Sequence, residues 1–278
     1  MGHAVVKFGL AAALLAGCYP GVDNSDCAIR CGENNACPSN LSCVSSFCVD
    51  EGQTCFDPDL VLAYSFDDIE DGMVVDRSPE QNTAGVAGDP MTVAGKHGNA
   101  LAFDGEGDFL ITRHSPSLAV APAGAYTVSM WVLVEPMQEF VFDQILVAKV
   151  WMNDETVSPF YEFGVEFDQA TNSIELIMGD ENNNLHTGYE IPIDPGTFVH
   201  IAFTWDGRFV HGYRDGIEVP FPDPELEIVV PDRGQNLVIG SQSQPSEFFT
   251  GKLDDLRIYR RALAAEEIVS DRDSAVGP

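Results

Sequence analysis

From Leu60 onward, short apolar stretches alternate with turn-forming residues, which is typical of an all-β domain. The stretch 126–134 is apolar on both faces and predicts a strand in the middle of a sheet. Residues 161–167 alternate, so the large apolar side chains should share one face, and we interpret Glu162 and Glu166 on the other as solvated. Further strands are expected at residues 60–66, 109–112, 145–149, 174–178, 198–205 and 237–240.

Two Asp-Gly pairs, Asp206-Gly207 and Asp215-Gly216, supply the positive φ that tight hairpins need. Residues 208–214 should therefore link two hairpins in a meander. No stretch alternates strands with long helices, which excludes a Rossmann-type arrangement. With 278 residues, 45% of them hydrophobic, the chain can form one large β-domain with small appendages. We predict an all-β protein with a single terminal helix.

The stretch 251–263 reads as a strand that runs directly into a helix, which we expect over residues 262–270. Strict alternation along the strand places Asp254 on one face with Leu256 and Ile258. Residues 253, 255, 257 and 259 lie on the other face. An unpaired carboxylate on an apolar face costs several kcal/mol of desolvation. Asp254 therefore needs a partner.

This last segment resembles the end of laminin-G-like, or concanavalin A-like jelly-roll, domains. Their final strand commonly reads Asp-Asp-Val-Arg-Ile-Tyr, then Asn-Arg-Ala-Leu and a short acidic helix; here residues 254–263 read Asp-Asp-Leu-Arg-Ile-Tyr-Arg-Arg-Ala-Leu. The match extends in order through residues 66–68, 98–105, 126–134 and 200–207 and covers roughly residues 60–270. The resemblance implies a two-sheet antiparallel jelly-roll sandwich. It says little about function, because one sandwich hosts many unrelated activities.

The same resemblance implies a structural calcium ion that ties the first strand to the last. In this family the aspartate that opens the last strand binds calcium together with backbone carbonyls near the N-terminal strand, and Asp254 matches that position. Asp67 would add a second carboxylate and Gly98 a carbonyl oxygen. Calcium accepts such mixed oxygen ligands in loose geometry. The alternative is an aspartate that only caps nearby backbone amides.

The first residues predict export and lipidation. Lys7 precedes an apolar run at 8–16, which is too short to span a bilayer but suits a signal peptide at residues 1–17. The run ends in Leu-Ala-Gly-Cys18, which resembles a bacterial lipobox. Lipidated Cys18 would become the mature N-terminus and anchor the protein to the bacterial cell envelope, at the outer membrane or cell surface. The alternative is an ordinary secreted protein cleaved nearby.

Residues 18–26 would then be a linker, followed by a cysteine-rich module at 27–55, the sandwich at 59–270 and a tail at 271–278. The module has almost no aliphatic core and an even set of cysteines: Cys27, Cys31, Cys37, Cys43, Cys48 and Cys55. In an exported chain this predicts three disulfides, whose pairing the sequence leaves open. A zinc site is the alternative, but no Cys-x-x-Cys pair or nearby histidine supports it.

Charge narrows the classes of partner. Against 14 Lys and Arg the chain has 44 Asp and Glu, a net charge of −30. This charge repels nucleic acids and anionic lipid surfaces, so we expect no nucleic acid partner and membrane contact through the lipid anchor alone. We interpret this acidity as a means of keeping the protein soluble. The alternative interpretation is a surface that collects divalent cations.

Catalytic patterns are incomplete. Glu166-Phe167-Asp168 begins like the Glu-x-Asp-x-x-Glu strand of some glycoside hydrolases with this sandwich, but the residues that follow, 169–171, supply no third acid. The histidines lack metal spacing, and no nucleophile elbow or phosphate loop occurs. We therefore expect no catalytic residues.

Trp151 opens a polar stretch between two expected strands, where an exposed indole could stack on a sugar. The alternative is a loop anchored into the end of the sandwich. Together these features predict a non-catalytic module on the bacterial envelope that binds a glycan or an extracellular or envelope protein. Two alternatives stay open: a structural or adhesive envelope protein without sugar affinity, and a divergent glycan-cleaving enzyme of the same fold.

Overall fold

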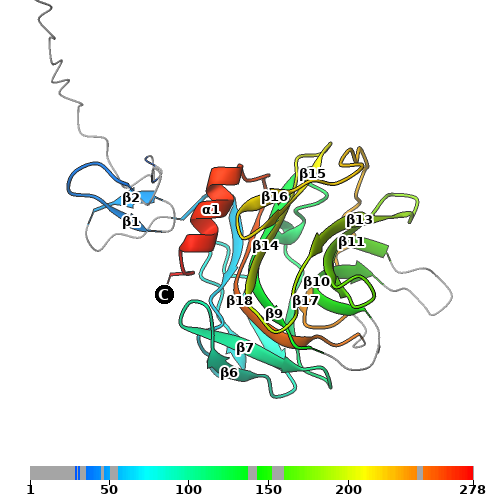
Figure 1. The fold of residues 1–278 in the computed structure, drawn as a ribbon, viewed down its shortest axis with the longest axis horizontal. Coiled ribbons are helices and arrows are strands. Elements are labelled where there is room, and N and C mark those ends of the chain that lie inside the picture. Colours follow the sequence, from blue (N-terminus) through cyan, green and yellow to red (C-terminus); the bar gives the residue numbers. More distant parts are fainter. Residues whose placement is uncertain are drawn as a thin grey trace, which may run out of the picture.

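The computed structural model describes residues 29, 31, 36–44, 47–50, 56–136, 143–151, 160–242 and 247–277. Two large antiparallel sheets pack face to face, so the predicted all-β sandwich is confirmed (Figure 1). The first sheet has the spatial order β16 (Ile217–Val219), β15 (Val210–Arg214), β14 (Val199–Trp205), β9 (Tyr126–Val134), β18 (Thr250–Tyr259), β7 (Asn99–Asp104) and β6 (Met91–Ala94), with β3 (Leu60–Tyr64) paired to β18.

The second sheet has the order β13 (Leu185–Pro192), β12 (Ser173–Gly179), β11 (Phe160–Asp168), β10 (Gln144–Trp151), β17 (Leu237–Ile239), β8 (Phe109–Thr112), β5 (Ala84–Ala87) and β4 (Met73–Val74). Strands β4, β5, β6 and β13 have no counterpart in the prediction. They are short or carry polar residues on both faces, so their apolar pattern is weak. Their place in the sandwich comes from pairing with stronger strands.

The main core lies between the sheets. Met130 and Val132 of β9 and Phe163 and Val165 of β11 are all fully buried in it. Burying each such side chain contributes about 1.5–3 kcal/mol. Every residue of β9 is buried, which confirms its predicted place within a sheet. The predicted meander is also present, with positive φ at Gly207 (94°), Asp215 (51°) and Gly216 (76°) in the two turns.

The alternation predicted for residues 161–167 is wrong at one end. Lys149 pairs with Phe163, and the next residue, Val150, pairs with Tyr161, so Glu162 is an extra residue in a β-bulge. The bulge moves Tyr161 out of the main core into a small cluster with Val150. Phe163 stays in the main core.

Strand β18 joins three neighbours: it pairs with β9 along its length, with β7 near its start and with β3 near its end. Its pairing with β9 shifts between Asp254 and Arg257, and Asp255 has a φ of 47°. Leu253 and Leu256 therefore both reach the main core. The strict alternation that placed them on opposite faces is wrong, because the bulge shifts the strand phase by one residue.

Helix α1 (Ala265–Asp273) packs on the outer face of the first sheet (Figure 1), where Ile268 joins a second buried cluster. It begins three residues after the predicted start at 262. Ala264 is still extended, and the Glu267 carboxylate accepts its N–H at 3.0 Å, so the helix is capped at this point. Beyond the helix Val276 is buried, and its N–H donates to Asp255 Oδ1 at 2.8 Å.

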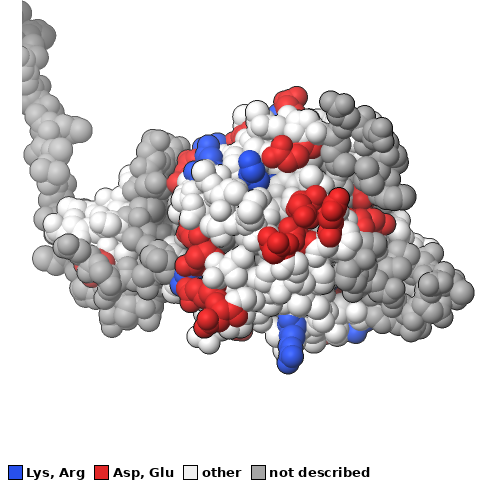
Figure 2. Space-filling model, turned by 90° about the horizontal axis from the view of Figure 1, so that it is seen from below, with Lys and Arg blue, Asp and Glu red and all other residues white. Residues whose placement is uncertain are grey.

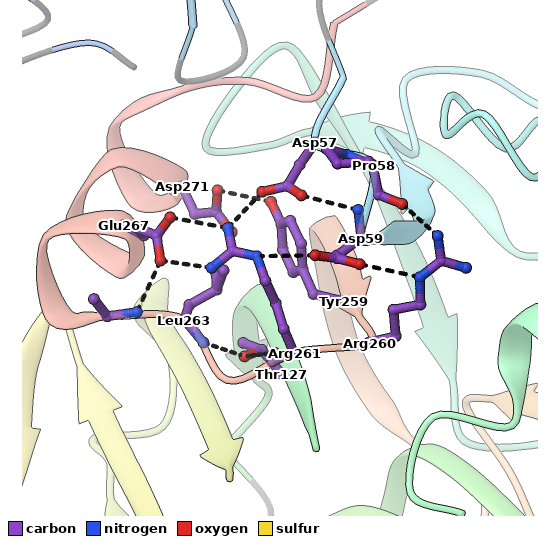
Figure 3. Close-up of polar contacts among 11 residues, drawn as sticks. Asp57, Pro58, Asp59, Thr127, Tyr259, Arg260, Arg261, Leu263, Glu267 and Asp271 are labelled. Atoms are coloured by element: carbon purple, nitrogen blue, oxygen red, sulfur yellow. Dashed lines mark hydrogen bonds and ion pairs between the residues drawn. The ribbon is translucent and has the colours of Figure 1, made fainter. Parts of the chain in front are cut away.

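A polar network fastens the segment before β3 to the end of β18 and to α1 (Figure 3). Arg261 donates to Asp57 and, at 2.7 Å, to Glu267, while Arg260 Nε donates to Asp59 at 3.1 Å. The Arg260–Asp59 and Arg261–Asp57 pairs link residues about two hundred positions apart in the chain. They hold the C-terminal helix against the start of the sandwich.

Ahead of the sandwich, β1 (Ser42–Val44) and β2 (Phe47–Val49) form a small antiparallel hairpin. On the face of the molecule in Figure 2, acidic side chains gather in several patches and basic side chains are sparse, as the net charge of −30 requires. Within the described part of the chain, we find no helix with the length and apolar character needed to span a bilayer.

Candidate functional site

The outer face of the second sheet lies on the opposite side of the sandwich from α1 (Figure 1). A row of small or aliphatic residues crosses six neighbouring strands on this face, in the order Gly85, Ile111, Val238, Ala148, Gly164 and Ile177. The middle of the face is therefore apolar, and polar groups lie beside it.

A groove of about 710 Å³ opens at the β4, β5 and β8 end of this row, lined by residues 73, 81–83, 85, 111–115 and 236. We call it the β5–β8 groove. Ile111 is 37% exposed and Met73 44%, so the groove offers apolar contact surface. Gln81, Arg113 and Asn236 are exposed beside it. An apolar floor with a few exposed polar side chains is the arrangement expected of a small-ligand site.

The backbone sets the positions of the polar residues of the groove. Gln81 has a φ of 54°, a left-handed conformation that is uncommon outside glycine. Its neighbour Asn82 is buried and donates to the Val61 carbonyl at 2.8 Å, which fixes the turn before β5. The His114 N–H donates to Asn236 Oδ1 at 3.0 Å and orients that amide. Sequence reasoning missed this groove, because its residues come from four separate segments.

Three glutamates lie directly opposite one another across β11, β12 and β13: Glu166 faces Glu175, and Glu175 faces Glu190. Glu166 is 8% exposed, and burial, followed by Asp143 and other nearby acids, raises its pKa to about 8. Burial also raises the pKa of Glu175, whose carboxylate accepts the Gly188 N–H. The interpretation of Glu166 as solvated is wrong, because the neighbouring strands and side chains cover it.

Glu162 is likewise buried, which corrects its predicted solvation. The bulge turns it to Lys149, whose Nζ lies 2.9 Å from Glu162 Oε1 and 2.8 Å from the Leu118 carbonyl oxygen. Both side chains are fully buried. Burial raises the pKa of Glu162 to about 7, and the Lys149 charge acts in the opposite direction. This pair is part of the scaffold at one end of the core.

Asp254 lies fully buried at the bulge of β18. Its Oδ2 accepts the backbone N–H groups of Lys96 at 2.7 Å and His97 at 2.9 Å. Its Oδ1 has no hydrogen-bond partner among the described residues, and burial raises the pKa of the carboxyl to about 7. One oxygen thus caps the turn between β6 and β7, and the other is a buried acceptor that a cation or a proton would satisfy.

The other two predicted calcium ligands, Asp67 and Gly98, lie at the turn that Asp254 caps. Asp67 Oδ1 accepts the Asn99 N–H at 2.8 Å, and a Cβ on Gly98 would lie 2.2 Å from that oxygen. The Gly98 carbonyl accepts the Gly95 N–H at 3.1 Å. Backbone N–H groups therefore already donate hydrogen bonds to the Asp67 and Gly98 oxygens that would bind calcium. The fit to calcium rests on the open Oδ1 of Asp254 and on the second lone pairs of the other oxygens.

Trp151 ends β10, and its backbone pairs with Phe160 across the start of β11. The polar stretch that follows it, residues 152–159, lies outside the described residues, and so does the Trp151 side chain. The prediction that its indole contacts a ligand stays a prediction.

Among the cysteines, Cys37 and Cys48 form a disulfide, and Cys31 is disulfide-bonded as well. Cys31 Sγ lies 3.8 Å from Cys37 Sγ. Such a cluster would suit a metal only as free thiolates, which these sulfurs are not. Cys18, Cys27 and Cys55 lie outside the described residues, as does the Cys43 side chain, so lipidation and the complete disulfide pairing stay predictions.

Solved structures share the fold at low identity. The receptor-binding domain of botulinum neurotoxin C/D mosaic serotype has a TM-score of 0.61 and 14% identity, covering 77% of this chain and 51% of that one. Domain 4 of AbnA, a GH43 extracellular arabinanase from Geobacillus stearothermophilus in complex with arabinotriose, has a TM-score of 0.57 and 20% identity, covering 77% and 98%. Trypanosoma rangeli sialidase in complex with the inhibitor DANA has a TM-score of 0.59 and 15% identity, covering 82% and 35%.

This chain spans about half the length of the botulinum neurotoxin C/D domain and of the similar binding domain of Paraclostridial Mosquitocidal Protein 1. At these identities the likeness shows the fold alone. No curated protein sequence matches the chain. The model of the concanavalin A-like lectin/glucanases superfamily matches residues 77–269, which is more than half of the 278 residues. The chain therefore belongs to the concanavalin A-like lectin/glucanases superfamily.

Proposed function

We propose that this protein is a non-catalytic binding module that a bacterial cell envelope displays as a lipoprotein, and that its sandwich binds a glycan. The observation that carries the proposal is the β5–β8 groove. Its exposed Ile111 and Met73 suit the apolar face of a sugar ring, and its Gln81 and Asn236 amides suit hydroxyl groups. A protein ligand and a purely adhesive role are the alternatives.

The solved neighbours support a binding role by analogy of fold. One is an arabinanase domain in complex with arabinotriose, and others are receptor-binding domains of neurotoxins. The proposal of envelope display rests on the lipobox-like segment that ends at Cys18 and on the cysteine-rich module after it. A lipid anchor followed by a spacer would hold the sandwich away from the membrane.

A glycan array tests the proposal, with the full chain carrying Cys18→Ser to keep it free of lipid. Gly85→Leu should abolish glycan binding, because a Cβ at Gly85 meets its first neighbour only at 3.9 Å and the added side chain would fill the groove without backbone strain. Ala94→Leu on the exposed edge strand β6 is the matched control. Binding that survives Gly85→Leu would place the ligand elsewhere, and no binding to any glycan would favour the alternatives.

Glycan cleavage is a second candidate, favoured by the facing pair Glu166 and Glu175. Side chains directly opposite on neighbouring strands have Cβ atoms about 4.5–5.5 Å apart. Retaining glycosidases need one protonated and one ionised carboxyl at such a separation. Glu166, with its pKa near 8, would be the acid. Both side chains are at least 91% buried, which limits access for a substrate. Release of reducing sugar that Glu166→Gln abolishes would establish cleavage and replace the leading proposal.

The calcium ion implied by the family resemblance is part of the proposal as a structural group. Asp254 Oδ1 would supply the buried carboxylate ligand, with Asp67 and the Gly98 carbonyl beside the same turn. The ion would neutralise a carboxylate that burial otherwise drives toward protonation. It would tie the turn between β6 and β7 to β18.

A further inference from the structure

The β5–β8 groove differs in charge from the rest of the molecule. Its lining includes one arginine and one histidine and no aspartate or glutamate, although the chain has 44 acidic and only 14 basic residues. A second surface cavity, of about 450 Å³, follows the general trend and is lined by Asp180, Glu181 and Glu227. The β5–β8 groove is therefore a site where an anion meets little local repulsion.

Arg113 distinguishes the groove further. It is exposed, and within the described ranges it is the one Lys or Arg side chain for which the structure has no ion pair, hydrogen bond or aromatic contact. Other exposed arginines have partners; Arg208, for example, lies 2.9 Å from Glu225 and Arg260 3.1 Å from Asp59. In a chain with three acids for each base, an unpaired arginine is unexpected unless its partner comes from outside.

The described groups around Arg113 leave its guanidinium available to bind a ligand. The nearest histidine, His114, is engaged: its backbone holds Asn236, and its Nε2 lies 3.6 Å from Asp232 Oδ2. Asp232 thus neighbours the histidine and is not part of the groove lining. The guanidinium of Arg113 can therefore offer its two parallel N–H donors to a ligand, the geometry that matches a carboxylate.

We infer that the β5–β8 groove binds a carboxylate-bearing sugar, such as a uronic or sialic acid residue within a glycan. This inference rests on the proposed function, that the sandwich binds a glycan in this groove. Arg113 pairs with the sugar carboxylate, Ile111 and Met73 contact the ring, and the Asn236 and Gln81 amides meet the hydroxyl groups. The net charge of −30 does not prevent this, because at physiological salt charges farther away than about 8 Å are largely screened.

The test uses an array of uronic and sialic acid glycans, each printed beside its methyl ester, together with neutral glycans. Esterification removes the charge and leaves the ring and its hydroxyl groups in place. The probe is the full chain with Cys18→Ser, alone and with Arg113→Gln. The control is Arg208→Gln, which changes the net charge by the same amount at an exposed arginine elsewhere on the surface.

The acid form of at least one glycan should bind about tenfold to hundredfold more tightly than its ester, and Arg113→Gln should abolish that preference while Arg208→Gln keeps it. Equal binding of acids and esters, or a preference that survives Arg113→Gln, would overturn the inference and leave the proposed function standing. Failure of acids, esters and neutral glycans alike would overturn both. An unchanged melting temperature of the Arg113→Gln protein would show that the loss of preference does not come from misfolding.

Discussion

The buried pair of Lys149 and Glu162 makes the sharpest stability prediction. Both side chains are fully buried, and Lys149 Nζ donates at 2.9 Å to Glu162 and at 2.8 Å to the Leu118 carbonyl. Lys149→Met keeps most of the side-chain volume and removes both hydrogen bonds. It leaves a buried carboxyl without its counter-charge, so we expect a loss of about 3–5 kcal/mol in the free energy of unfolding.

The double variant Lys149→Met with Glu162→Met provides the contrast. Removing both charges also removes the desolvation cost of both, so its stability should equal that of the wild type or exceed it by about 1–4 kcal/mol. The exposed pair is the control: Arg208, 57% exposed, faces Glu225, and Arg208→Met should cost less than about 1 kcal/mol.

Urea unfolding followed by tryptophan fluorescence measures all four proteins. Two buried tryptophans report on it: Trp205 in the main core, and Trp131, whose indole N–H donates to the Arg272 carbonyl of α1. For a domain of this size the single variant should melt on the order of 10 °C lower. If Lys149→Met loses less than about 1 kcal/mol, or if the double variant is as unstable as the single one, the buried ion pair does not have the role assigned to it.

Three further predictions follow from the other sites. Because the folded pKa of Glu166 is about 8 against an ordinary 4.5, the folded state binds more protons than the unfolded state between these pH values. The free energy of unfolding should therefore fall as pH rises through this window, by at most about 1.4 kcal/mol per pH unit. Melting curves at pH 5 and pH 8 measure this fall, and Glu166→Gln should flatten it. If calcium binds at Asp254, the wild type should melt higher in excess calcium than in EDTA and Asp254→Asn should melt lower and ignore the chelator; identical wild-type curves would show that Asp254 only caps the turn between β6 and β7. Mass spectrometry should find a diacylglyceryl group on Cys18, and Cys18→Ser should release the protein from membranes; an unmodified N-terminus at another residue would refute lipidation.

Local patterns in the sequence predicted the main frame of this fold. The long apolar run of β9 and the Asp-Gly turns around β15 were recognisable because each depends on adjacent residues: apolar continuity marks a strand with two covered faces, and a positive φ marks a tight turn. The family also followed from local segments, above all residues 254–263. The sequence further singled out Asp254, because an acid among apolar neighbours is costly wherever the strand is placed.

Only the tertiary structure decided which face each side chain takes and which acids meet. The bulges at Glu162 and at Asp254 to Asp255 shift the strand phase, and they arise from pairing with neighbouring strands, which strict alternation along one chain does not reveal. Pairing also sets Glu175 opposite Glu166, although the third acid was missing along β11 itself. The β5–β8 groove forms for the same reason. Its walls come from segments far apart in the chain, and only the lateral order of strands in the second sheet brings Arg113 beside Asn236.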